Sequence, residues 1–189
     1  MCNPRFCRNL VLLVLAVFGT VTVNAQQVDK RVEEIRKLYA EVNQQIADHE
    51  KSSEESTIYM NELVVNKSRG SWPAVGIYEV TMKFYYTFGD RERYPYPNRL
   101  LKVTTFTKRS STTYYDEYLF NTAAQLVFHF QKEGDNTEME RRHYFTAERL
   151  IKSTIGTRNL DTTRREALDD AREILDLKKQ LVAVFVNSR

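Results

Sequence analysis

One stretch decides the fold class: Gly76-Ile77-Tyr78-Glu79-Val80-Thr81-Met82-Lys83-Phe84-Tyr85-Tyr86-Thr87-Phe88. Apolar and aromatic side chains occupy every second position, namely Tyr78, Val80, Met82, Phe84, Tyr86 and Phe88. Successive side chains of a β-strand point to opposite faces, so this spacing predicts a long strand with one apolar face. The opposite face carries Glu79, Thr81, Lys83 and Thr87.

Similar segments lie on both sides of this one. Each is short, rich in β-branched or aromatic residues and bounded by polar or turn residues, which is typical of strands. The predicted strands are Thr57–Asn66, Gly76–Phe88, Leu100–Lys108, Thr112–Phe120, Ala124–Gln131, Glu138–Phe145 and Arg149–Ile155. Glu133-Gly134-Asp135-Asn136 is the strongest hairpin turn among their connections.

Two of these hairpins have related sequences. Tyr118-Leu119-Phe120 is followed after five residues by Leu126-Val127, and Tyr144-Phe145 is followed after four by Leu150-Ile151. The pattern resembles the hairpin repeats of MORN-type proteins, but it lacks their glycines and has two copies. Two ordinary hairpins that share an aromatic composition are the favoured interpretation, and either one predicts a meander.

The two ends of the chain have a helical period. Apolar residues step by three and four from Val28 to Ile46, and a polar run from Ser52 predicts that this helix ends near Lys51. Asp29 is its expected amino-terminal cap. A second apolar stripe follows Thr162 and includes Leu168, Ala171, Leu175, Leu181 and Phe185, with Asp161 or Thr162 as the expected cap.

We therefore expect an α+β fold. An antiparallel β-meander sheet of about six or seven strands would be flanked by an N-terminal and a C-terminal helix packed on one face. The uncovered face would then carry Tyr85, Tyr115, Leu119, Val127 and Tyr144. This face could form a concave aromatic cup, or it could be an ordinary wet sheet face, which antiparallel sheets tolerate.

The first 25 residues have the layout of a cleaved secretory signal. Arg5 and Arg8 precede an apolar run from Leu10 to Val23, and the segment ends in Val23-Asn24-Ala25 with small residues at the cleavage positions. We expect residues 1–25 to be removed and residues 26–189 to form one domain, exported to the periplasm or the outside of the cell. A retained membrane anchor is the alternative, although the run is shorter than the ~20 apolar residues that span a bilayer.

Removal of this segment changes the charge and the thiol content. The chain has 28 Lys and Arg against 25 Asp and Glu, and loss of Arg5 and Arg8 leaves 26 against 25. A nearly neutral body gives no electrostatic reason to expect nucleic acid as a partner. Both cysteines, Cys2 and Cys7, also leave, which excludes disulfides, thiol nucleophiles and thiolate metal sites from the mature chain.

The sequence offers few candidates for a catalytic or metal site. His129 and His143 could come close if the strands around Asp135 pair, and with Glu117 or Glu140 they could bind a metal. Their spacing matches no known motif, so we predict ordinary packing, no metal and no cofactor. Carboxylate pairs such as Asp116-Glu117 are explained by cross-strand charge pairing.

One connecting segment has the composition of a recognition surface. Residues 89–97 place two arginines and two tyrosines on a loop stiffened by two prolines, and Tyr and Arg are enriched where proteins bind partners. The predicted binding residues are Trp72, Arg91, Arg93, Tyr94 and Tyr96. The alternative is that both tyrosines fold back onto the sheet while Arg91 and Arg93 pair with neighbouring acids.

These features favour an exported, non-catalytic binding or structural domain of the cell envelope. Its partner would be a protein, a peptide or an envelope glycan, with no transmembrane anchor after cleavage. The alternative is a carboxylate-based hydrolase that acts in the aromatic cup, which would need convergent carboxylates with separated pKa values.

The signal sequence generates the first testable prediction. Mass spectrometry of the exported protein should find an amino terminus at Gln26, because cleavage is expected after Ala25. Recovery of chains that still begin at Met1 from outside the cytoplasm would contradict it.

Overall fold

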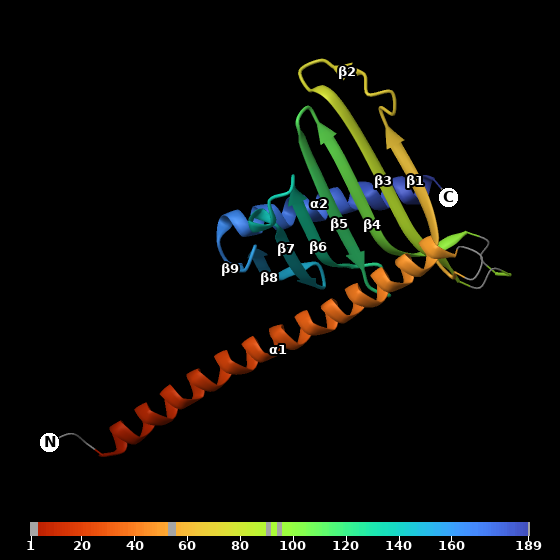
Figure 1. Ribbon diagram of the computed structural model, residues 1–189. Helices are drawn as coiled ribbons and strands as arrows, with labels where there is room; N and C mark the ends of the chain where they lie inside the picture. Colours follow the sequence, from red (N-terminus) through yellow and green to blue (C-terminus); the bar gives the residue numbers. More distant parts are fainter. Residues whose placement is uncertain (1–3, 53–55, 90–91, 94–95, 189) are drawn as a thin grey trace.

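The computed structural model describes the backbone of residues 4–52, 56–89, 92–93 and 96–188, and their side chains except those of residues 4–25 and 98. Within these ranges it contains two α-helices, a short 3₁₀ helix and nine strands (Figure 1). The helices are α1 (Pro4–Lys51), η1 (Thr137–Met139) and α2 (Arg165–Asn187). The strands are β1 (Tyr59–Val65), β2 (Ser71–Trp72), β3 (Gly76–Phe88), β4 (Pro97–Arg109), β5 (Thr112–Phe120), β6 (Leu126–Glu133), β7 (Arg141–Thr146), β8 (Arg149–Ile155) and β9 (Arg158–Leu160).

The strands form an antiparallel meander, which confirms the predicted α+β fold. The order across the sheet is β1-β3-β4-β5-β6-β7-β8-β9, and β2 pairs with the start of β3. All seven predicted strands are present. The two additional strands, β2 and β9, have two and three residues, too few to show a period in the sequence. The predicted turn also forms, since β6 ends at Glu133 and Gly134 adopts a φ of 56°.

The two helices pack on opposite faces of the sheet, so the prediction that both pack on one face is wrong in this detail. Helix α2 covers the face of Phe84, Tyr118 and Phe145. Helix α1 covers the other face, which includes Tyr85 and Leu119. The pairs Phe84/Tyr85 and Tyr118/Leu119 are adjacent in sequence and all less than a tenth exposed. Neighbouring strand residues point to opposite faces, so burying both requires a cover on each side.

Helix α1 is longer than the sequence period indicated. It runs without interruption from Pro4 and ends at Lys51, as predicted. Asp29 is therefore inside the helix and does not cap it; its Oδ1 lies 3.5 Å from Lys152 Nζ on β8. The buried stripe of this helix is Val32, Ile35, Val42 and Ile46.

Helix α2 begins later than predicted and without a side-chain cap. Its N-cap residue is Arg164, and neither Asp161 nor Thr162 caps it. Asp161 instead accepts a hydrogen bond from the backbone N–H of Thr163 at 2.9 Å, which closes the turn before the helix. The buried stripe of α2 includes Ala171, Ile174, Leu181 and Phe185.

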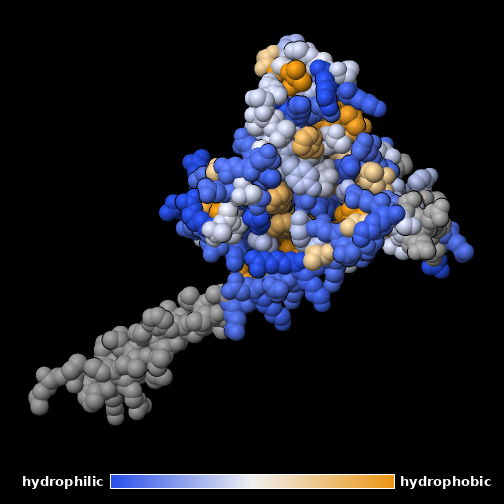
Figure 2. All heavy atoms as spheres, in the orientation of Figure 1, coloured by the Kyte–Doolittle hydropathy of each residue, from blue (hydrophilic) through white to orange (hydrophobic). Residues whose placement is uncertain are grey.

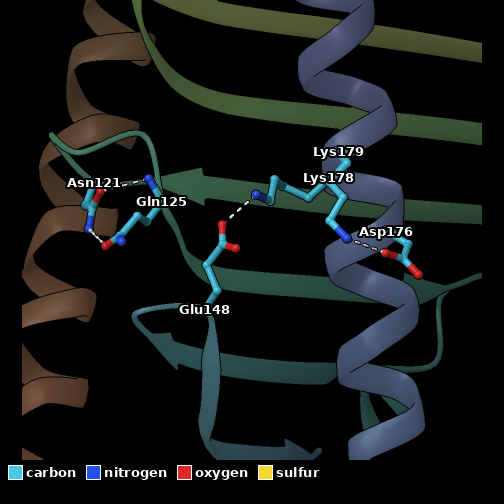
Figure 3. Close-up of polar contacts among 6 residues, drawn as sticks. All are labelled: Asn121, Gln125, Glu148, Asp176, Lys178 and Lys179. Atoms are coloured by element: carbon cyan, nitrogen blue, oxygen red, sulfur yellow. Dashed lines mark hydrogen bonds and ion pairs between the residues drawn. The ribbon is translucent and has the colours of Figure 1, made fainter.

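A buried lysine also attaches α2 to the sheet (Figure 3). Lys178 Nζ lies 2.5 Å from Glu148 Oε1, and the lysine side chain is 11% exposed. Glu148 sits in the β7–β8 turn, where both Ala147 and Glu148 have positive φ. Lys179, the next residue, faces outward and pairs with Asp176 on the same helix at 2.7 Å. The pair with Glu148 thus attaches the helix to the β7–β8 turn.

The helices cross the sheet near one end of its long strands. Strands β3 and β4 have 13 residues each, and their far ends, with those of β1 and β5, extend beyond both helices (Figure 1). In the part of the chain that the structure describes, no helix is long and apolar enough to span a membrane.

The packing of α2 predicts that its carboxyl-terminal turns are essential. Phe185 is 4% exposed and its ring lies 5.9 Å from that of Phe84. Removing a buried phenylalanine side chain costs ~3–5 kcal/mol, against a total stability of ~5–15 kcal/mol. Phe185→Ala should lower the urea midpoint strongly, and truncation after Asp176 should abolish cooperative unfolding.

The adjacent residue provides the control. Val186 is 42% exposed, so Val186→Ala should change stability by no more than ~0.5 kcal/mol. A truncated protein that still melts cooperatively would show that α2 is dispensable.

Candidate functional site

The residues predicted to bind a partner are partly described. Trp72 lies in β2, is 43% exposed and has its ring centroid 5.1 Å from that of Tyr78. Tyr96, just before β4, is 62% exposed, and Arg93 is also exposed. Arg91 and Tyr94 lie outside the described residues.

The structure does not bring these residues together. Trp72 pairs with Gly76 at the start of β3, whereas residues 89–96 follow Phe88 at its end. A 13-residue strand rises ~3.3 Å per residue, so the two positions are ~40 Å apart. Trp72 and the segment of Tyr96 are therefore two separate surfaces.

A better-formed site lies on the α1 face, where three strands supply three rows of side chains. Cross-strand pairing aligns Thr81 with Phe106 and Phe106 with Tyr115 in the first row. The second row is Lys83, Thr104 and Glu117. The third row is Tyr85, Lys102 and Leu119. Each row runs across β3, β4 and β5. Thr104 lies at the centre of the middle row, and its small side chain leaves a depression among the larger ones.

This depression, the α1 groove, has a volume of about 350 Å³. Its lining residues are Ile46, Glu50, Thr81, Lys83, Tyr85, Lys102, Thr104, Phe106 and Tyr115. Thr104 is the central small residue, and the last turns of α1 close one side through Ile46 and Glu50. Figure 2 shows this side of the molecule, where a hydrophilic α1 borders a sheet with hydrophobic patches. The volume is at the lower end of the range for ligand pockets.

A buried ion pair lies beneath the groove. Lys102 Nζ is 2.9 Å from Glu117 Oε1, and the two side chains are 5% and 8% exposed. Tyr115 donates to Glu117 Oε1 at 2.6 Å and Tyr39 donates to Oε2 at 2.7 Å. Lys102 also donates to Asn43 Oδ1 at 2.7 Å. Both charges are therefore compensated by hydrogen bonds from the sheet and from α1, as a buried pair requires.

Burial sets the protonation behaviour of these groups. It lowers the pKa of Lys102, an effect that the Glu117 carboxylate opposes. Burial, followed by the hydrogen bond to Glu117, raises the pKa values of Tyr39 and Tyr115 far above the usual value of a phenol. Both hydroxyls therefore keep their protons near neutral pH and act as donors. Glu117 accepts a hydrogen bond on each oxygen, which suits a structural role.

The concave aromatic face proposed from the sequence is largely filled. Tyr85, Leu119, Val127 and Tyr144 all belong to the core under α1 and are at most 5% exposed. The predicted carboxylate pair is also divided: Glu117 faces α1, whereas Asp116 faces α2 and lies close to His129. Two adjacent carboxylates on opposite faces of a sheet cannot act on one substrate. Among the described residues, two openings remain beside α1 on this face: the α1 groove and a smaller cavity lined by Tyr39, Phe128 and Tyr144.

The two strand histidines do meet, on the α2 face. His129 and His143 are directly opposite in the β6–β7 pairing, and their Nδ1 atoms are 3.5 Å apart. Each is 2% exposed, so they are core residues beneath α2 and not part of an open sheet surface. His129 Nε2 lies 3.3 Å from Asp116 Oδ1 without the angle of a hydrogen bond.

A small polar cavity of about 80 Å³ borders the histidine pair. Arg141 and Asp170, which pair at 2.9 Å between β7 and α2, form part of its wall. Among the residues that the structure describes, no group of three His, Cys, Asp or Glu side chains has the arrangement of a metal site.

Sequence reasoning missed Lys102, the charged residue in the floor of the groove. A signal was present, because Lys102 interrupts the apolar run Leu100-Leu101-Lys102-Val103 inside a predicted central strand. A lysine at such a position is buried only when paired, which implies an acidic partner on the neighbouring strand.

In comparisons with known proteins, no protein-family model, no curated protein and no solved structure matches the chain.

The histidine pair generates a prediction about pH. Burial, then the proximity of His129 and Arg141, lowers the pKa of His143 to about 3 from an ordinary value of 6.5. The unfolded chain therefore takes up this proton near pH 6.5 and the folded protein does not until about pH 3. The contribution of His143 to stability is complete above pH 6.5 and declines as the pH falls through this window, by up to ~1.4 kcal/mol per pH unit.

Urea unfolding at pH 7, 5.5 and 4.5 checks this prediction. His143→Phe should flatten the decline relative to the unchanged protein. Ser153→Ala alters the residue that pairs with His143 on β8 and removes no titrating group, so its decline should match that of the unchanged protein. Equal slopes for His143→Phe and the unchanged protein would contradict the prediction.

Proposed function

We propose that this chain is an exported, non-catalytic binding domain that holds its ligand in the α1 groove. The observation that carries the proposal is the arrangement of the groove itself. Three neighbouring strands surround Thr104 with large side chains, and α1 closes one side. Sites built on sheets and helices hold their geometry better than sites on loops.

Export is supported by where the packed part of α1 begins. Cleavage after Ala25 would leave Val28, which packs on the core under α1, and Asp29, which lies 3.5 Å from Lys152. The proposed cleavage therefore removes the signal and leaves the docked segment of the helix intact.

A binding role suits the chemistry of the groove better than catalysis does. A catalytic acid or base needs a group that can exchange a proton with the substrate. In the groove, Glu117 and Lys102 bind each other, and Tyr115 is held by its hydrogen bond to Glu117. A carboxylate-based hydrolase is less well supported, since Asp116 lies on the far side of the sheet from Glu117.

A substitution that fills the groove tests the proposal. Thr104→Trp should place a large side chain in the depression and prevent ligand capture. The purified, immobilised protein would be exposed to envelope and extracellular fractions of its source cells, and the retained material would be compared between variants.

Thr107→Trp is the matched control. It makes the same change on the same strand, but position 107 has the parity of the α2 face. We expect the unchanged protein and Thr107→Trp to retain the same material and Thr104→Trp to lose it. If folded Thr104→Trp captures the same material in the same amount, the groove is not the binding site.

A further inference from the structure

We infer that the ligand of the α1 groove is an uncharged saccharide, one ring or two linked rings in size. This inference rests on the proposed function, because it names the chemical class of the ligand at that site.

The walls of the groove suit a compact ring. Phe106 is 45% exposed although it lies over the middle of the sheet, and Tyr85 and Tyr115 stand on the two neighbouring strands. The first and third rows are four residues apart, so the floor is ~13 Å long, and three strands make it ~10 Å wide. These dimensions admit one or two sugar rings that lie with a C–H face against aromatic side chains.

The charges of the groove do not favour an ionic ligand. Lys102 is bound by Glu117 and Asn43. Lys83 Nζ lies 3.8 Å from Glu62 on β1, and Glu50 stands at the α1 side of the groove. The two lysines are thus balanced by nearby carboxylates. An anion would therefore leave water without gaining an uncompensated partner charge, which is costly. A cation could approach Glu50, but that carboxylate lies exposed at the α1 side, where water screens an ion pair and makes it worth little.

The polar groups around the aromatic side chains do not favour a purely apolar ring. Thr81, Thr104, Lys83 and Glu50 all line the groove. A hydrocarbon would cover these donors and acceptors without replacing their hydrogen bonds to water, and each buried unsatisfied group lowers affinity. Sugar hydroxyls both donate and accept, so they can replace that water while the C–H face contacts Phe106.

The position of the groove also disfavours an extended peptide. Peptides that add to a sheet pair with the free backbone of an edge strand. The groove is centred on β4, which pairs with β3 on one side and β5 on the other. Its ligand therefore meets side chains on a sheet face, and α1 limits its length on one side.

Titrations followed by aromatic NMR resonances of the exported protein test the inference. The neutral probes are glucose, N-acetylglucosamine, maltose, cellobiose and chitobiose. The charged probes are glucuronate and glucosamine, and cyclohexanol represents an apolar ring. We expect saturable shifts of groove resonances with at least one neutral sugar and weaker binding of its charged analogues and of cyclohexanol.

Two truncations of exposed side chains locate the site. Phe106→Ala should weaken sugar binding roughly tenfold or more, as expected for an aromatic anchor. Ile77→Ala is the matched control, because Ile77 is 47% exposed on β3 and does not line the groove. It should bind as the unchanged protein does. Neither change removes a buried side chain, so both proteins should fold.

The outcomes separate this inference from the proposed function. If no neutral sugar binds, or if a charged probe or cyclohexanol binds more tightly, the saccharide inference is wrong. If Thr104→Trp nevertheless loses the captured material, the groove is still the binding site and its ligand belongs to another class. If Phe106→Ala and Ile77→Ala bind sugar equally, the sugar occupies another surface and the inference is also overturned.

Discussion

The structure depends on the burial of its central strands on both faces. In β3, Phe84 packs under α2 and the next residue, Tyr85, packs under α1; in β5, Tyr118 and Leu119 repeat the arrangement. No single helix can cover both residues of such a pair. The two terminal helices, which are separated by more than a hundred residues in the sequence, thus cover two cores on opposite faces of one sheet.

Two-sided burial also accounts for the polar groups in the interior. Lys102 and Glu117 belong to strands whose neighbouring residues, Val103 and Tyr118, are buried on the α2 side. Their own side chains must then lie under α1. There they form an ion pair with each other and hydrogen bonds with Tyr39, Asn43 and Tyr115. On the α2 face, His129 and His143 occupy the equivalent buried position, and burial keeps the pKa of His143 low. Each face therefore buries polar groups, and the sheet separates the Lys102–Glu117 pair from the histidine pair.

The α1 groove forms because the long strands β3 and β4 extend beyond the helices that pack on them. Both helices cross near one end of the 13-residue strands, so the far half of β3 and β4 has no helix above it (Figure 1). On the α1 face this boundary falls beside Thr104, where the last turn of α1 meets the rows of Phe106 and Tyr85. A groove is formed because a small side chain stands between large ones at the place where the covering helix ends. Neither the alternation of the strands nor the helical period of the sequence shows that the small side chain lies where the helix ends.

The sequence by itself determined the elements and their order. The alternation in Gly76–Phe88, the helical stripes and the turn at Gly134 are local signals, because side-chain direction and backbone freedom follow from a few neighbouring residues. What depends on distant residues was decided by the tertiary structure. The alternation of β3 shows two faces but not what covers each one, so α1 was expected on the same side as α2. Composition identified Trp72 and Tyr96 as similar residues, but a strand of ~40 Å separates them. Lys102, Thr104 and Glu117 acquire their roles through pairing across β4 and β5 and contact with a helix some sixty residues earlier, and such contacts exist only after the chain has folded.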